Sequence, residues 1–130
     1  MALLLLIDDE QAVRRIVARM LVRAGHEVVE ADDGQAGLRA LERLRPDLVI
    51  TDMVMPNKEG IETIAGIRAL TDAPILAVSG ARPADGLDVL KDARMLGASA
   101  TLAKPFSSEE LLATINSLLA ASGPAPGEGA

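Results

Sequence analysis

Residues 3–10 read Leu-Leu-Leu-Leu-Ile-Asp-Asp-Glu, an apolar run that ends abruptly in three acidic residues. A continuous apolar run of this length is typical of a parallel strand buried on both faces. A helical pattern follows it and ends at Gly25, because apolar residues recur there at spacings of three and four. The residues expected on the buried face of this helix are Val13, Ile16, Val17, Met20, Leu21 and Ala24.

The same helix carries a series of arginines and no acidic residue. Helical spacing puts these arginines away from the apolar stripe, so we interpret them as a solvated face and consider a docking role for it secondary. The series consists of Arg14, Arg15, Arg19 and Arg23.

The alternation of strand and helix recurs four more times along the chain. Strands are expected at residues 26–30, 48–50, 74–78 and 99–103. Asp33 can cap the second helix, which should run through Leu44, and Ser107 and Glu110 form a capping box for the last helix. The third helix should bury Ile61, Ile64, Ala65 and Ile67, and a fourth should run from about residue 84 to 96. Five such units predict an α/β fold, a three-layer sandwich with a parallel sheet.

Strand composition also predicts the order of the sheet. Residues 3–7, 48–50 and 74–78 are continuously apolar, whereas the runs at 26–30 and 99–103 contain charged or polar residues and suit the edges. The flavodoxin-like (βα)5 order 2-1-3-4-5 satisfies this with right-handed crossovers. Its ligand-binding crevice lies at the carboxyl ends of strands one and three.

Length and composition limit the class of protein. The 130 residues fit one domain over residues 1–121, followed by a Gly/Pro/Ala-rich tail at 122–130 that we expect to be disordered. The net charge of −6 disfavours direct binding to nucleic acid. The lack of cysteine fits a reducing cytoplasm. The apolar start has no basic flank and is too short for a signal peptide or a membrane span.

Three carboxylates should meet at the crevice. Asp8 and Asp9 follow the first strand and Asp52 follows the third. Three negative charges a few ångström apart are unfavourable unless a cation lies between them, although acidic residues also gather at strand ends simply as helix caps. A hard divalent ion with oxygen ligands, Mg²⁺ or Mn²⁺, suits such a site.

Two further polar residues end strands at the same edge. Ser79 follows the fourth strand and Lys104 the fifth. Each alone is unremarkable, as a turn residue or a solvated lysine. Together with the carboxylates, a hydroxyl and an ammonium form an environment for a phosphoryl group, with Asp52 as its acceptor.

With these motifs the sequence closely resembles the receiver domain of two-component response regulators over about residues 2–121. The matching segments are Ile7–Glu10, Asp47–Pro56 with Gly60, Val78–Gly80 and Ala103–Phe106. The resemblance implies a stand-alone phosphorylatable receiver in a two-component system or phosphorelay. Its partners would be a histidine kinase or histidine phosphotransfer protein and an output protein that the sequence does not name.

The resemblance also implies a role for each site residue. Asp52 would be the phosphoacceptor, and Mg²⁺ would be held by Asp8, Asp9, Asp52 and the carbonyl of Val54. Ser79 and Gly80 would form the switch, and Lys104 would bind phosphate before a cis Pro105. Such a protein is a signalling switch rather than an enzyme, and it catalyses only its own aspartyl phosphorylation and dephosphorylation.

One position departs from the family pattern. The family usually has Tyr or Phe three residues before the lysine, and here that residue is Thr101. We therefore expect the response to phosphorylation to be carried by the backbone from Ser79 to Asp85 rather than by an aromatic side chain.

Two other classes share parts of this chemistry. A phosphatase of the haloacid dehalogenase type also uses an aspartyl phosphate, but its Asp-x-Asp motif is broken at Asp52-Met53-Val54 and a cap domain has no room here. A non-phosphorylated interaction module on the same fold is disfavoured because the acceptor residues are all present. A flavin-binding protein is disfavoured because Asp8, Asp9 and Glu10 would repel its phosphate.

Overall fold

The computed structural model describes residues 2–52, 59–79 and 97–122 of the chain. These residues contain one parallel sheet of five strands in the order β2-β1-β3-β4-β5. The order predicted from strand composition is therefore confirmed. The strands are β1 (Leu3–Ile7), β2 (Glu27–Ala31), β3 (Leu48–Asp52), β4 (Ile75–Ser79) and β5 (Ala100–Ala103).

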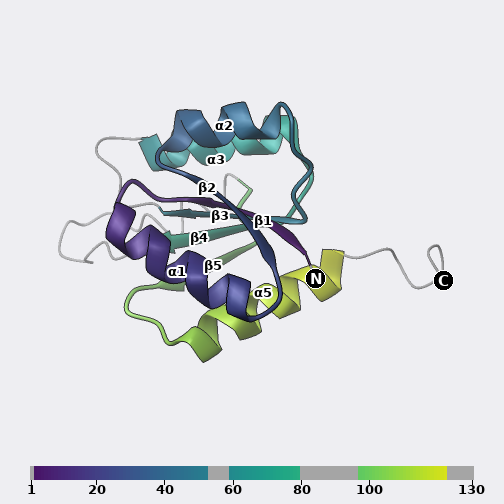
Figure 1. Ribbon diagram of the computed structural model, residues 1–130. Coiled ribbons are helices and arrows are strands. Elements are labelled where there is room, and N and C mark those ends of the chain that lie inside the picture. Colours follow the sequence, from purple (N-terminus) through teal and green to yellow (C-terminus); the bar gives the residue numbers. More distant parts are fainter. Residues whose placement is uncertain (1, 53–58, 80–96, 123–130) are drawn as a thin grey trace.

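Helices cover both faces of the sheet. Figure 1 shows α2 and α3 on one face and α1 and α5 on the other. Their bounds are α1 (Gln11–Arg23), α2 (Gly34–Leu41), α3 (Glu59–Leu70) and α5 (Ser108–Ser122). Among the described residues, no helix is long and apolar enough to cross a membrane. The helix expected at about 84–96 and the tail at 123–130 lie outside the described residues.

The first strand shows why its sequence is apolar without alternation. Leu5 and Ile7 belong to the core beneath α2 and α3, whereas Leu4 and Leu6 belong to the core beneath α1 and α5. Strands β3 and β4 are buried throughout, and the edge strands β2 and β5 are only partly buried. Continuous apolar sequence therefore marks the strands that have helices on both faces.

Two helix caps agree with the sequence. The Oδ1 atom of Asp33 accepts a hydrogen bond of 2.7 Å from the amide of Ala36. At α5 the amide of Glu110 donates to Oγ of Ser107 at 3.0 Å, and the amide of Ser107 donates to Oε1 of Glu110 at 3.1 Å. These bonds satisfy amides that the first turn of a helix leaves unpaired.

The predicted faces of α1 and α3 need correction. In α1 the buried residues are Val17, Ala18 and Leu21, and Ile16 is 56% exposed. Successive residues are about 100° apart around a helix, so a face that includes Ala18 turns Ile16 toward solvent. Ala24 is also exposed, beyond the helix end.

In α3 the predicted core residue Ala65 is exposed, and Thr63 is buried with an exposed fraction of 3%. Residues two apart do not share a helix face, so Ala65 cannot be buried beside Ile67. The second helix ends at Leu41 and does not reach Leu44, which still packs against the core beneath α2 and α3. The side chain of Ile61 lies outside the described residues.

Hydrogen bonds hold the residues that lead into β5. Arg68 of α3 donates from Nη2 to the carbonyl of Gly97 at 3.0 Å and from Nη1 to the carbonyl of Thr71 at 3.2 Å. Ser99 then bonds to Ile75 twice, through its amide at 2.8 Å and its Oγ at 3.1 Å. Gly97 has a φ of +123°, which side chains other than hydrogen rarely allow.

Candidate functional site

Four of the predicted polar residues lie at the carboxyl ends of the strands. Asp8 follows β1, Asp52 ends β3, Ser79 ends β4 and Lys104 follows β5. Because the strands are parallel, their carboxyl ends meet at one edge of the sheet. Asp8, Asp52 and Ser79 are buried, with exposed fractions of 4%, 4% and 3%. The fold therefore brings the predicted site together.

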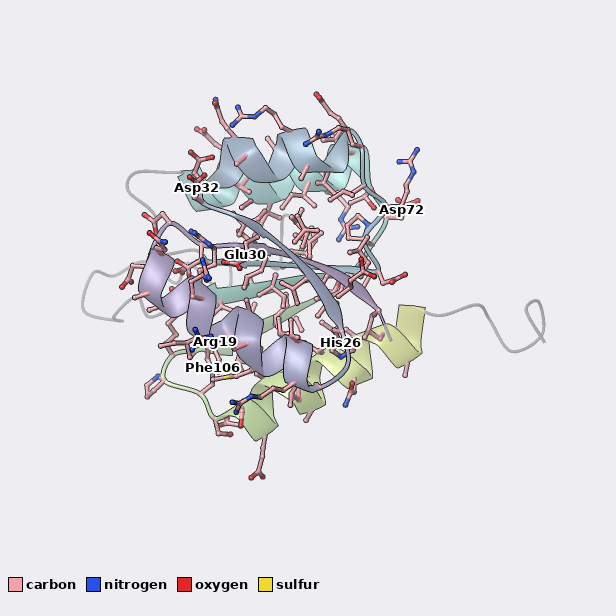
Figure 2. All side chains as sticks on the ribbon, viewed as in Figure 1. Arg19, His26, Glu30, Asp32, Asp72 and Phe106 are labelled. Carbon is pink, nitrogen blue, oxygen red and sulfur yellow. The ribbon has the colours of Figure 1, made fainter. Side chains whose placement is uncertain are left out.

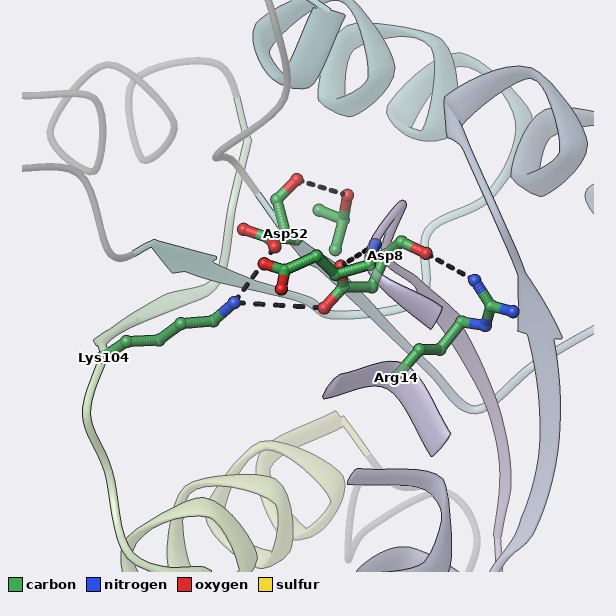
Figure 3. Close-up of polar contacts among 6 residues, drawn as sticks. Asp8, Arg14, Asp52 and Lys104 are labelled. Atoms are coloured by element: carbon green, nitrogen blue, oxygen red, sulfur yellow. Dashed lines mark hydrogen bonds and ion pairs between the residues drawn. The ribbon is translucent and has the colours of Figure 1, made fainter. Parts of the chain in front are cut away.

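The centre of the site is an ion pair between Lys104 and Asp52. Nζ of Lys104 lies 3.0 Å from Oδ2 of Asp52 and 3.9 Å from Oδ2 of Asp8. Figure 3 shows the ammonium beside the two carboxylates, with Arg14 on the far side of Asp8. One cation thus faces two buried anions.

Asp9 completes an acidic cluster. One carboxylate oxygen from each of Asp8, Asp9 and Asp52 lies within 4.8 Å of the others, and Asp9 is exposed while the other two are buried. Asp9 is therefore the carboxylate of this cluster that is in contact with solvent.

The electrostatics of Asp8 show the cost of this arrangement. The pKa of its carboxyl is raised from 3.8 to about 6; burial is the main cause and the neighbouring Asp52 also raises it, whereas the Glu10 amide and Lys104 lower it. The Glu10 amide donates to Oδ1 of Asp8 at 2.9 Å. The ionised form of Asp8 is thus under-compensated by the groups around it.

These features fit a divalent cation. The donors are carboxylate oxygens, the local charge of three aspartates and one lysine is negative, and the ionised state of Asp8 lacks compensation. Mg²⁺ and Mn²⁺ prefer such hard oxygen donors and keep open positions for water or phosphate. The acidic pocket formed by Asp8, Asp9 and Asp52 could therefore bind a divalent metal.

The remaining predicted site residues are placed as follows. The carbonyl of Ser79 accepts from the amide of Lys104 at 2.9 Å, which joins the ends of β4 and β5. The Lys104–Pro105 peptide is cis, as the resemblance implied. Thr101 lies in β5 opposite Ala77 of β4 and is partly buried. Val54 and Gly80 lie outside the described residues.

Arg14 was assigned wrongly to the solvated face of α1. Its side chain is only 12% exposed. Nη1 donates to the carbonyl of Asp8 at 2.8 Å, and Nε donates to Oε1 of Glu30 at 3.0 Å. Arg15, by contrast, is 59% exposed. Arg14 lies one turn into α1, so its side chain can reach back to the main chain of Asp8. This spacing was the signal in the sequence from which the contact could have been predicted.

The fold and the site together define a doubly wound α/β domain with an acidic pocket at the carboxyl ends of its strands, and comparisons with known proteins identify its family. Residues 4–116 match the model of the response regulator receiver domain. The chain belongs to this family. It is the receiver domain of a two-component response regulator.

Relatives of known sequence lead to the same family. The chain is 38% identical over 112 residues to transcriptional regulatory protein PdtaR of Mycobacterium tuberculosis, and the alignment covers 85% of this chain and 53% of PdtaR. It is 36% identical over 131 residues to response regulator MprA of Mycolicibacterium vanbaalenii, which covers 97% and 54%. The chain thus spans about half the length of these relatives.

Solved structures show the same fold over most of both chains. The chemotaxis protein CheY4 of Vibrio cholerae is 32% identical with a TM-score of 0.79, covering 91% of this chain and 98% of CheY4. A receiver domain protein from Clostridium thermocellum is 30% identical with a TM-score of 0.82, covering 93% and 96%.

Proposed function

We propose that this receiver accepts a phosphoryl group on Asp52 from the phosphohistidine of a histidine kinase or phosphotransfer protein, and that phosphorylation switches its binding to an output protein. A carboxylate oxygen of Asp52 forms the new bond to phosphorus, the P–N bond to the imidazole breaks, and the leaving nitrogen takes up a proton. The protein acts as a cytoplasmic switch and catalyses only its own phosphorylation and dephosphorylation.

One observation carries the proposal, the placement of Asp52 within 3.0 Å of Lys104 and within 4.8 Å of the two other acidic residues. The ammonium of Lys104 can follow the negative charge from the carboxylate to a phosphoryl oxygen. Ser79 ends the neighbouring strand, so its hydroxyl is a candidate to meet a second oxygen.

Asp8, Asp9 and Asp52 would hold Mg²⁺ or Mn²⁺, with the carbonyl of Val54 as a further ligand. When bound, the metal would neutralise charge on the phosphoryl group and the carboxylates. Asp8 and Asp9 would position it beside Asp52; of these three residues, Asp9 is the exposed one.

The test uses phosphoramidate as donor, because its P–N bond resembles that of phosphohistidine. We expect Mg²⁺-dependent addition of one phosphoryl group to the wild type, measured by intact mass. Asp52→Asn should lose the label, and Asp32→Asn, which changes an exposed carboxylate after β2, should keep it. Borohydride reduction should convert labelled Asp52 into homoserine. Label on Thr51 or Ser79 would overturn the assignment.

A further inference from the structure

Asp8 is held at three atoms besides Oδ2, the carboxylate oxygen that faces Lys104. Its amide donates to the carbonyl of Ala31 at 3.1 Å. Its carbonyl accepts from Nη1 of Arg14 at 2.8 Å, and its Oδ1 accepts from the amide of Glu10 at 2.9 Å. Both its main chain and one side of its carboxylate are therefore constrained.

Arg14 is itself held from a second strand. Oε1 of Glu30 accepts from its Nε at 3.0 Å, and the Glu30 side chain is 30% exposed. In Figure 2, Glu30 lies toward the carboxyl end of β2 and His26 lies at its other end. Glu30 directly precedes Ala31, the residue that bonds the Asp8 amide. The contacts thus close a ring through β1, α1 and β2.

The positive charge of Arg14 is offset within this ring. The guanidinium of Arg14 is paired with the Glu30 carboxylate, so it adds little net positive charge beside the acidic pocket. Nη1 of Arg14 bonds the carbonyl of Asp8, so Arg14 acts on Asp8 through the main chain.

We infer that Arg14 is a positioning residue of the acidic pocket, which, held by Glu30, fixes the main chain of Asp8 and so the direction of its carboxylate. A planar guanidinium can serve both acceptors at once, because Nε and Nη1 diverge in a rigid fork. Partners that orient metal ligands in this way commonly change metal affinity by roughly 10–100-fold when they are removed. The consequence for Mg²⁺ rests on the proposed function.

The experiment compares Arg14→Met with Arg15→Met. Arg15 is a matched control, because it is the next residue of the same helix and lies 4.0 Å from the other oxygen of Glu30, but its side chain is 59% exposed. Two quantities are measured by NMR on the whole chain. The first is hydrogen exchange of the Glu10 amide without metal, and the second is the Mg²⁺ dissociation constant from amide shifts.

We expect Arg14→Met to speed hydrogen exchange of the Glu10 amide about fivefold, an effect the size of one modest hydrogen bond. We also expect it to weaken Mg²⁺ binding about tenfold. Arg15→Met should change neither. Glu30→Gln should give smaller effects of the same sign. Adding it to Arg14→Met should change little further, because both substitutions break the same ring.

Equal behaviour of Arg14→Met and Arg15→Met would overturn the inference. The inference would also be overturned if Arg14→Met accelerated hydrogen exchange of the Leu6 amide in β1 as much as that of the Glu10 amide, since that result would mean a general loosening of the fold. If Arg14→Met does not fold, Glu30→Gln decides by the same two measurements. If the wild type binds no Mg²⁺, the proposed function fails, and the metal-free exchange of Glu10 still decides the role of Arg14.

Discussion

Nζ of Lys104 lies 3.0 Å from Oδ2 of Asp52, although the two residues are 52 positions apart in the chain. Only the parallel sheet brings them together, because they end strands on either side of β4. The ammonium of Lys104 is therefore placed to interact with negative charge that is added at Asp52. The first prediction follows from this contact.

Lys104→Ala should slow phosphoryl transfer to Asp52 by about 10–100-fold, because a donor aimed at developing charge is removed. The rate of labelling by phosphoramidate at fixed Mg²⁺ measures this effect. Arg43→Ala, which removes an exposed cation after α2, should label at the wild-type rate. An unchanged rate in Lys104→Ala would contradict the phosphate-binding role.

The second prediction concerns pH and Asp8. Its pKa is about 6 in the folded protein and near 3.8 in the unfolded chain, so the folded state binds the proton more tightly. The free energy of unfolding therefore falls as pH rises from about 4 to about 6 and does not recover above that range.

Without metal at pH 7.5, Asp8→Asn should raise the free energy of unfolding by about 1–3 kcal/mol, and the gain should vanish near pH 4. The amide oxygen of asparagine can keep the bond from the Glu10 amide. Urea denaturation at both pH values, with Asp32→Asn as control, measures the difference. A gain that is the same at both pH values would rule out ionisation as its cause.

The third prediction concerns Gly37 of α2, which packs against the Ile7 side chain. A Cβ at Gly37 would lie 2.8 Å from Cγ1 of Ile7 and closer still to its Cδ1. Gly37→Ala should therefore destabilise the fold by about 1–3 kcal/mol, as overpacking does. Because Ile7→Val removes Cδ1, the double variant should lose less than the sum of the single losses. Additive losses in urea denaturation would count against the contact.

The fourth prediction concerns Thr101, whose side chain is small and branched at Cβ. Beryllofluoride should shift the amide signals of Ser79 and Lys104, and Thr101→Ala should leave these shifts nearly unchanged. Comparison of amide spectra with and without the phosphoryl mimic tests both statements. If Thr101→Ala abolishes the response, Thr101 is a gate and the backbone account is wrong.

The sheet order could be predicted because burial on two faces leaves a direct mark on composition. The runs at Leu3–Ile7 and Leu48–Ile50 are apolar throughout, and both strands lie inside the sheet. The polar ends of those strands then located Asp8 and Asp52 at one edge. Because the carboxyl ends of parallel strands lie together, this inference needs only the position of each residue in its strand and no knowledge of contacts.

Side-chain contacts could not be predicted in the same way. Arg14 and Arg15 are the same residue type at adjacent positions, and one is 12% and the other 59% exposed. The rotation of α1 by a fraction of a turn decides between them, and the same rotation exposes Ile16. The hydrophobic pattern does not fix a rotation that small, since Ala18 and Ile16 are both apolar.

The bonds that join Arg68 to Gly97 and Ser99 to Ile75 have a consequence for the site at the other end of the sheet. They anchor the return of the chain to the sheet at its amino-terminal edge, before β5 begins. The register of β5 against β4, and with it the position of Lys104, is thereby tied to Arg68 and Ser99 at the opposite end of the sheet. A substitution at either residue would act on the acidic pocket from a distance, by shifting Lys104 relative to Asp52.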